Sequence, residues 1–400
     1  MNNRIASTSL IGLLMAATAH AQTSVTLYGV VDNGFVYQNS STTAGSTSGG
    51  KSSVKMMNGA WAGSRFGLKG AEDLGNSTKA IFQLEAGINT ANGAAGYSGG
   101  LFTRASWIGL THPVYGTLSA GRQYTAYYTL LSPYSPTPWL TGYFGAHPGD
   151  IDSLDTGYRA NNSIVYMSPQ FYGITVGGSY ALGGVPGSVN AGSTWSAGIQ
   201  YKNGPFGIAA GFQRINNSTP GGGMWGANST ASSGGVQPDA SAINNGYLTA
   251  QAQQRVAVTA GYQFSSSWDI SASYSNVQYI PGTNSSFANT ATFNTAGAVL
   301  HFKPGPVWDF AGGYSYTRAS KSNGIENGAQ YHQFTVSQYY SLSARTGIYA
   351  VEAYQRSSGK TLGTNGQIIN ATASIGDGFN GAPSSSRSQI AAGVGLIHRF

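Results

Sequence analysis

Apolar and polar residues alternate along most of this chain, and this alternation restricts the fold more than any other feature of the sequence. Along residues 251–264, Val256 and Val258 share one face, whereas Arg255 lies on the other. A period of two residues indicates a β-strand with one apolar face, because successive side chains point to opposite faces. The pattern recurs along the chain, so the sequence predicts an all-β fold.

The apolar faces of these strands need a partner, which is either a protein core or lipid. Charged residues make up only 8% of the chain, against about 25% in ordinary soluble domains. Past the N-terminal segment, no apolar run reaches the roughly eighteen residues that a membrane helix requires. The chain also contains no cysteine. A closed barrel fits all of this, because it pairs every strand, leaves no edge and turns its apolar faces to lipid.

The N-terminal segment has the order of a secretory signal peptide. Arg4 precedes an apolar stretch at 10–17, which is followed by the small residues of Ala-His-Ala. A basic start, an apolar centre and small residues before the cleavage point are typical of export signals. We therefore predict that residues 1–21 are removed and that residues 22–400 form one exported barrel domain.

Loop lengths indicate which kind of barrel this is. Short turns such as 265–267 alternate with long Gly-, Ser- and Asn-rich segments such as 217–248 and 358–386. Outer-membrane barrels have short periplasmic turns and long extracellular loops, and an even number of antiparallel strands. The sixteen predicted strands lie near 24–37, 54–70, 78–90, 101–112, 117–125, 160–170, 173–181, 192–203, 206–216, 249–264, 268–279, 290–302, 307–318, 329–341, 345–357 and 387–400. A barrel of about this size encloses an aqueous channel.

Several short motifs, taken in order, carry a resemblance to a known family. The motifs are those at 22–32, 64–70, 104–110, 121–123 and 394–400. They resemble the β-proteobacterial branch of the Gram-negative general porins. The resemblance implies a 16-stranded antiparallel transmembrane β-barrel in the cell outer membrane, surrounded by lipid and lipopolysaccharide. It further implies a homotrimer without a cofactor, through which small hydrophilic solutes and ions diffuse passively.

One segment, 125–158, interrupts the alternation and is rich in Pro and aromatic residues. Long stretches without regular structure inside a compact fold are usually functional. The segment resembles loop three of porins, which folds into the lumen and narrows it. Its acidic residues Asp150, Asp152 and Asp155 are therefore candidates for the pore constriction.

Arginines on the inner wall are the expected counterpart of these acids. Strand period places Arg65 opposite Phe66 and Leu68, and an arginine facing lipid at mid-depth costs about 2–4 kcal/mol. Arg65 is therefore expected to point inward. The resemblance adds Arg104 and Arg159, with Arg122 as a further candidate. A positive wall opposite an acidic loop creates a field across the lumen. Loss of Arg4 with residues 1–21 changes the net charge from +7 to +6, and this charge together with the resemblance predicts a preference for anions.

The C-terminal strand alternates regularly and ends on an aromatic residue, Phe400. In the family that this chain resembles, a terminal Phe on such a strand is read by the barrel-assembly machinery. Phe400 is therefore the candidate assembly signal.

Other functions have weaker support in the sequence. The six histidines are scattered without metal-ligand spacing, so neither a catalytic residue nor a metal site is predicted. Basic residues form no cluster with interleaved aromatics, which argues against nucleic acid as a partner. Two alternatives with the same fold stay open: a substrate-specific outer-membrane channel for a sugar, phosphate or dicarboxylate, and a surface adhesin barrel.

Overall fold

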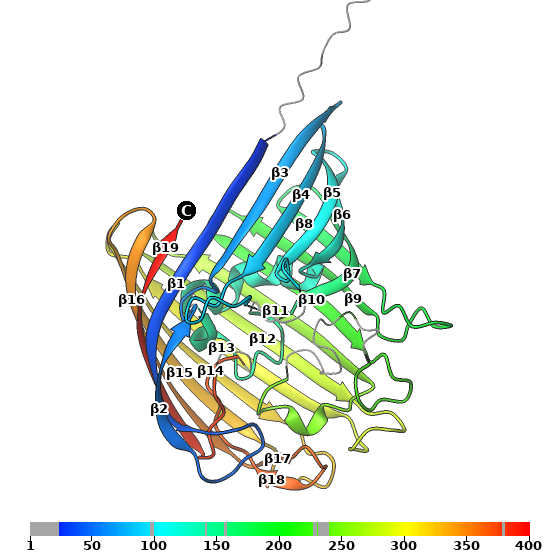
Figure 1. Ribbon diagram of the computed structural model, residues 1–400, viewed down its shortest axis with the longest axis vertical. Coiled ribbons are helices and arrows are strands. Elements are labelled where there is room, and N and C mark those ends of the chain that lie inside the picture. Colours follow the sequence, from blue (N-terminus) through cyan, green and yellow to red (C-terminus); the bar gives the residue numbers. More distant parts are fainter. Residues whose placement is uncertain are drawn as a thin grey trace, which may run out of the picture.

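The strands form one closed barrel (Figure 1), seen in a computed structural model. The structure describes residues 24–96, 100–140, 142–155, 158–226, 230, 240–377 and 381–400. The predicted signal peptide and the predicted start at Gln22 lie outside the described residues. Within the described residues, no helix has both the length and the apolar character needed to cross a membrane.

The barrel wall is a single antiparallel sheet in which chain neighbours pair with one another. Its strands are β1 (Ser24–Ser41), β2 (Lys51–Asn58), β3 (Arg65–Gly75), β4 (Thr78–Gly87), β5 (Ala105–His112), β6 (Gly116–Gln123), β7 (Ala160–Met167), β8 (Ile174–Ala181), β9 (Thr194–Asn203), β10 (Phe206–Asn216), β11 (Ala252–Gln263), β12 (Trp268–Ile280), β13 (Ala291–Phe302), β14 (Trp308–Ala319), β15 (Gln330–Ser341), β16 (Thr346–Ser358) and β19 (Ser388–Arg399). The first and last strands, β1 and β19, pair along Val30–Gln38, which closes the barrel.

The predicted number of strand positions is confirmed, but one predicted strand is broken. The range near 54–70 is in fact β2 and β3, which pair one after the other with the two halves of β1. The described strands of the wall therefore fill sixteen positions around the barrel. Residues 59–64 leave the wall between β2 and β3, where the alternation predicted an uninterrupted strand.

The two faces of the wall differ as the alternation requires. Outward side chains are exposed and apolar, with exposed fractions of 60% for Leu27, 65% for Ile108 and 53% for Phe334. Inward side chains such as Gln253 and Thr295 are fully buried. An antiparallel barrel places successive residues on opposite sides, so the apolar set faces the membrane and the polar set faces the interior.

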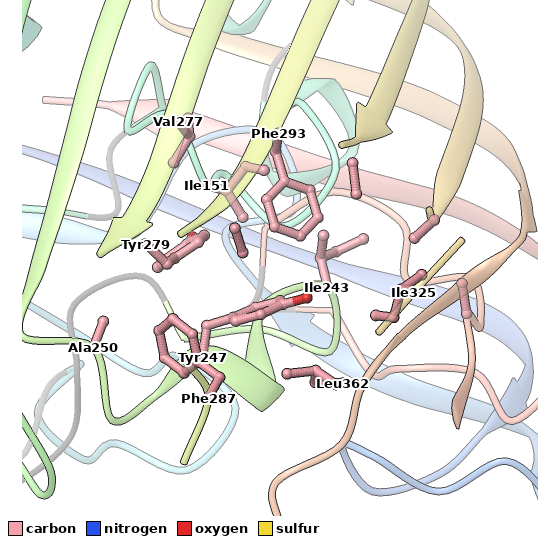
Figure 2. Packing of buried hydrophobic residues seen from close by; sticks show 14 of the residues in the cluster. Ile151, Ile243, Tyr247, Ala250, Val277, Tyr279, Phe287, Phe293, Ile325 and Leu362 are labelled. Atoms are coloured by element: carbon pink, nitrogen blue, oxygen red, sulfur yellow. The ribbon is translucent and has the colours of Figure 1, made fainter. Parts of the chain in front are cut away.

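Part of the interior is apolar where long loops cover the inner wall. Val277 and Phe293 point inward from β12 and β13 and pack against Ile151, Ile243 and Tyr247 from loops (Figure 2). The rings of Tyr247 and Phe293 lie 5.8 Å apart in an edge-to-face arrangement. This cluster holds the segments around residues 151 and 243–247 against the inner wall of the barrel.

Two predicted loops contain regular structure. The long segment at 358–386 holds a small hairpin of β17 (Lys360–Leu362) and β18 (Ile368–Asn370). The described residues of the Pro-rich segment 125–158 form four short helices, which are α1 (Ala126–Leu131), η1 (Ser132–Tyr134), α2 (Thr137–Leu140) and α3 (Gly142–Gly145). Another helix, η2 (Asn245–Tyr247), lies in the loop that covers the inner wall.

Candidate functional site in the barrel lumen

The Pro-rich segment folds into the barrel, and polar side chains of the inner wall hold its first half. The Gln200 amide donates to the carbonyl oxygen of Leu130 at 2.7 Å. The hydroxyl of Thr259 donates to the carbonyl oxygen of Leu131 at 2.9 Å. Thr125 caps α1 and donates to Gln213 at 2.6 Å. The inward polar side chains of the barrel wall therefore bind this segment.

The second half of the segment is held by the next strands along the wall. The Arg255 Nε donates to the carbonyl oxygen of Ile151 at 2.8 Å. The Gln333 amide donates to the carbonyl oxygen of Ala146 at 2.8 Å, and the Thr335 hydroxyl donates to that of Phe144 at 3.1 Å. These hydrogen bonds thus fix the segment to the inside of the wall between β9 and β15.

Glycines in the wall let α1 approach closely. A Cβ on Gly198 would lie 3.0 Å from Cδ1 of Leu130, and one on Gly211 would lie 2.8 Å from Cδ1 of Leu131. A larger residue at either position would force these leucine side chains to move.

A second element narrows the lumen from the other side, and Asp32 fixes it. The carboxylate of this buried residue accepts hydrogen bonds from the backbone N–H groups of Trp61, at 2.9 Å, and Ala62, at 2.6 Å. It also accepts one from the hydroxyl of Tyr349 at 2.6 Å. Trp61 and Ala62 belong to residues 59–64, which leave the wall between β2 and β3. The hydrogen bonds to Asp32 therefore fix this segment in one position inside the barrel.

The two inward elements meet at Gly142, which has φ +59°. A Cβ on Gly142 would overlap the carbonyl oxygen of Ala60. Gly142→Ala is expected to separate α3 from residues 59–64 and to raise the unitary conductance in planar bilayers. Gly184→Ala is the matched control, because Gly184 has φ +73° and no atom lies within 4 Å of the added Cβ. If both substitutions change the unitary conductance equally, the contact between Gly142 and Ala60 does not explain the change.

Beside these elements lies a cavity of about 970 Å³ in the lumen. Arg65 and Arg104 line its wall side, and Tyr128, Pro133 and Asp155 line it from the Pro-rich segment. It continues to the short-turn end of the barrel, where the lining comes from 306–307, 341–344 and Arg399. The cavity therefore connects the narrow part of the lumen with one mouth of the barrel.

Arg65 and Arg104 share one carboxylate, that of Glu85 on β4. The Nε of Arg104 lies 2.7 Å from Glu85 Oε1, and the Nε of Arg65 lies 3.6 Å from Glu85 Oε2. The Tyr28 hydroxyl donates to the same carboxylate at 2.9 Å. Two guanidinium groups against one carboxylate leave one positive charge at this place on the wall.

Sequence reasoning missed Glu85, although a signal for it was present. Strand period places Glu85 with Gln83 and opposite Leu84 and Ala86. The argument that turned Arg65 inward applies to a carboxylate on the next strand, because a charge facing lipid is unfavourable.

The other two predicted arginines lie outside the lining of this cavity. Arg159 is buried and stacks on the ring of Tyr124, with 4.4 Å between the guanidinium carbon and the ring centroid. Arg122 lies two residues after Ala120 on β6 and therefore shares its outward face. The Arg122 Nη1 donates to Asn161 Oδ1 at 2.6 Å. The predicted inward position of Arg122 therefore disagrees with its strand face.

The three predicted acids occupy different environments. Asp155 lines the cavity with the arginines, whereas the Asp150 carboxylate is buried and accepts a hydrogen bond from the backbone N–H of Asp155 at 2.9 Å. Asp152 faces the wall, with its carboxylate 2.6 Å from His147 Nδ1 and 2.7 Å from the Ser275 hydroxyl. Burial acts to raise the pKa of Asp152, but His147 and Ser275 outweigh it and lower that pKa. The predicted place of Asp152 in the constriction is thus not supported, since it anchors the segment instead.

The described residues contain no group of three or more His, Asp or Glu side chains suited to a metal ion.

A closed barrel with an inward loop and a charged lumen is the architecture of a porin. The sequence profile of the Gram-negative porin family matches residues 6–360. The chain belongs to the Gram-negative porins.

Curated relatives agree with this family over part of the chain. This porin is 33% identical over 223 residues to an outer membrane porin protein of Bordetella pertussis, an alignment that covers 51% of this chain and 57% of that one. It is 34% identical over 226 residues to outer membrane porin protein 32 of Delftia acidovorans, covering 53% and 61%. The porin thus spans little more than half the length of the relatives it matches.

Solved structures agree in fold over nearly the whole chain. The anion-selective porin from Comamonas acidovorans is similar, with a TM-score of 0.69, 24% identity, and coverage of 95% of this porin and 100% of that chain. Salmonella typhi OmpF, solved in complex with daunomycin, has a TM-score of 0.58 and 16% identity, with coverage of 94% and 97%. Family and fold together make this porin a multi-pass protein of the cell outer membrane and not an enzyme.

Proposed function

We propose that this porin forms a water-filled channel for the passive diffusion of small hydrophilic solutes and ions, with a preference for anions. The observation that carries the proposal is the cavity of about 970 Å³ lined by Arg65, Arg104 and Asp155. Its lining combines these charged groups with hydroxyl side chains such as Ser132, Thr137 and Ser341, which suits solutes that keep part of their hydration.

The charges around this cavity favour anions. Its lining includes the guanidinium groups of Arg65, Arg104 and Arg399 and the carboxylates of Asp155 and Asp309. The Glu85 carboxylate offsets one of the two charges of Arg65 and Arg104. Asp309 lies near the short-turn mouth, 3.8 Å from the Lys303 ammonium. Charges in a narrow lumen with low-dielectric walls are screened less than in bulk water, so a small excess of positive charge changes which ions enter. The Comamonas acidovorans porin is described as anion-selective, but at 24% identity it supports the fold alone.

Two measurements on the purified protein test the channel itself. Insertion into a planar bilayer is expected to give stepwise increases of current that scale with salt concentration. Liposomes that contain the protein are expected to swell in neutral sugars, with a rate that falls as the sugar becomes larger. A conductance that saturates at low concentration of one solute would instead support a substrate-specific channel for a sugar, phosphate or dicarboxylate.

Assembly of the barrel is proposed to depend on Phe400. Its backbone N–H donates to the carbonyl oxygen of Gly29 at 3.1 Å, and the Gly29 N–H donates back at 3.0 Å. This fixes the last residue at the seam between β19 and β1, with a ring that is 44% exposed and accessible to the barrel-assembly machinery. Phe400→Ala is expected to lower the amount of folded protein in the outer membrane, measured as the heat-modifiable band on a denaturing gel. An unchanged amount would contradict the role.

Export and oligomeric state are part of the same proposal. N-terminal sequencing of the outer-membrane form is expected to begin at Gln22, after loss of residues 1–21. The protein is proposed to be a homotrimer embedded in lipid and lipopolysaccharide. A heat-sensitive oligomer band of three times the mass of the heated form is expected, and a monomer in mild detergent would contradict the trimer.

A further inference from the structure

We propose that the lumen contains a binding subsite for aromatic monocarboxylates, in which Arg65 binds the carboxylate and Trp61 stacks on the ring. The inference rests on the proposed channel function and names a class of solute for it. Its basis is that the indole of Trp61 and the guanidinium of Arg65 line the same cavity.

The first step is the proximity of the two groups. The Arg65 Nη1 donates to the carbonyl oxygen of Gly63 at 2.8 Å. The guanidinium therefore folds back onto the segment that carries Trp61. Both side chains line the cavity of about 970 Å³. An anion bound by Arg65 would have its remaining atoms beside the indole.

The second step is the rigidity of the indole. The ring of Trp61 lies 5.0 Å from that of Tyr339 and 5.3 Å from that of Tyr349. Its backbone N–H is held by the Asp32 carboxylate at 2.9 Å. Because the ring is already ordered, a ligand that stacks on it does not have to immobilise it.

The third step is the opposite side of the cavity. Tyr128, Pro133 and Pro138 of the Pro-rich segment line it. A flat solute between Trp61 and these residues therefore has apolar atoms on both faces. Aromatic rings gain more from such contacts than alicyclic rings of similar size, because ring quadrupoles favour offset and edge-to-face arrangements.

The fourth step is charge. Arg65 and Arg104 share the single carboxylate of Glu85, so the pair has one positive charge in excess. The side chain of Arg65 is 27% exposed and that of Arg104 only 8%, so Arg65 is the group that a solute reaches. A carboxylate matches the fork of a guanidinium. A single excess positive charge matches a solute with one negative charge, so the site favours monoanions.

The test measures inhibition of single-channel chloride current by benzoate, cyclohexanecarboxylate and acetate at equal pH and ionic strength. Benzoate is expected to reduce the current in a saturable manner. Half-maximal inhibition is expected at a concentration about three- to tenfold lower than for cyclohexanecarboxylate, as expected for one aromatic contact. Acetate is expected to have little effect. Equal inhibition by benzoate and cyclohexanecarboxylate would overturn the inference.

Variants then assign the effect to the indole. Trp61→Leu is expected to make benzoate no better than cyclohexanecarboxylate, and Trp61→Phe to retain part of the difference. Trp308→Leu is the matched control, because Trp308 is on the outer face and 46% exposed, and it should behave as wild type. An unchanged preference in Trp61→Leu would overturn the inference. A conducting wild-type protein without preference would leave the channel function standing, whereas a protein without conductance would refute both.

Discussion

Replacing Arg65 and Arg104 together with Gln is expected to turn an anion-preferring channel into a cation-preferring one. The two substitutions remove both positive partners of Glu85. The cavity then keeps Arg399 against Asp155 and Asp309, with the Glu85 carboxylate unpaired beside it. The reversal potential in a salt gradient across a planar bilayer is expected to change sign. Leaving a buried charge without its partner costs about 3–5 kcal/mol, so resistance to heat should also fall.

The triple variant with Glu85→Gln added is the control for this prediction. It removes the unpaired carboxylate, so the reversal potential is expected to move back toward zero and the loss of stability to be smaller. If the double variant keeps the sign of the wild type, the charges of Arg65 and Arg104 do not determine selectivity, and the account of the lumen is wrong.

Asp32→Ala is expected to release the inward segment at 59–64. The carboxylate accepts hydrogen bonds from Trp61, Ala62 and Tyr349, and the substitution leaves these donors without their acceptor inside the barrel. Loss of hydrogen bonds to a charged group costs on the order of 3 kcal/mol. The folded band on a denaturing gel is expected to disappear at a lower temperature. The open-channel current is expected to become noisier, because the segment no longer has one fixed position.

Asp73→Ala serves as the comparison for this substitution. Asp73 lies at the exposed end of β3, where its carboxylate accepts a hydrogen bond from the Gly75 N–H at 2.8 Å. It is expected to leave both the heat resistance and the current unchanged. If the open-channel current of Asp32→Ala is no noisier than that of the wild type, the segment is held by something other than this carboxylate.

The barrel could be predicted from the sequence because its cause is local. A residue in a strand faces lipid or the interior according to its parity, and the penalty for a charge in lipid assigns the faces. Arg65 follows this rule and lines the cavity. Glu85 obeys the same rule, and applying it on β4 would have found the partner of the arginines.

The inward segment at 59–64 could not be predicted in the same way. Its sequence, Gly-Ala-Trp-Ala-Gly-Ser, also fits a strand. Its position depends on Asp32 of the neighbouring strand β1 and on Tyr349 of β16, which reaches Asp32 only when the barrel closes. The same limit applies to Gly142, where a side chain is excluded by the carbonyl oxygen of Ala60 from another segment.

The acids of the Pro-rich segment show a related limit. The resemblance to loop three of porins placed Asp150, Asp152 and Asp155 on one inward loop but did not tell which of them face water. Asp155 lines the cavity, whereas Asp152 turns to His147 and Ser275. The difference depends on which wall residue lies opposite each carboxylate, and that follows from the tertiary path of the loop.

The reversal potential of the wild-type protein tests the central claim most directly. The purified porin is inserted into a planar bilayer with a salt gradient of potassium chloride, and the voltage of zero current is recorded. The lumen with Arg65, Arg104 and Arg399 in its lining predicts a potential whose sign shows chloride to be more permeant than potassium. A potential of the opposite sign, or none, would contradict an anion-preferring channel.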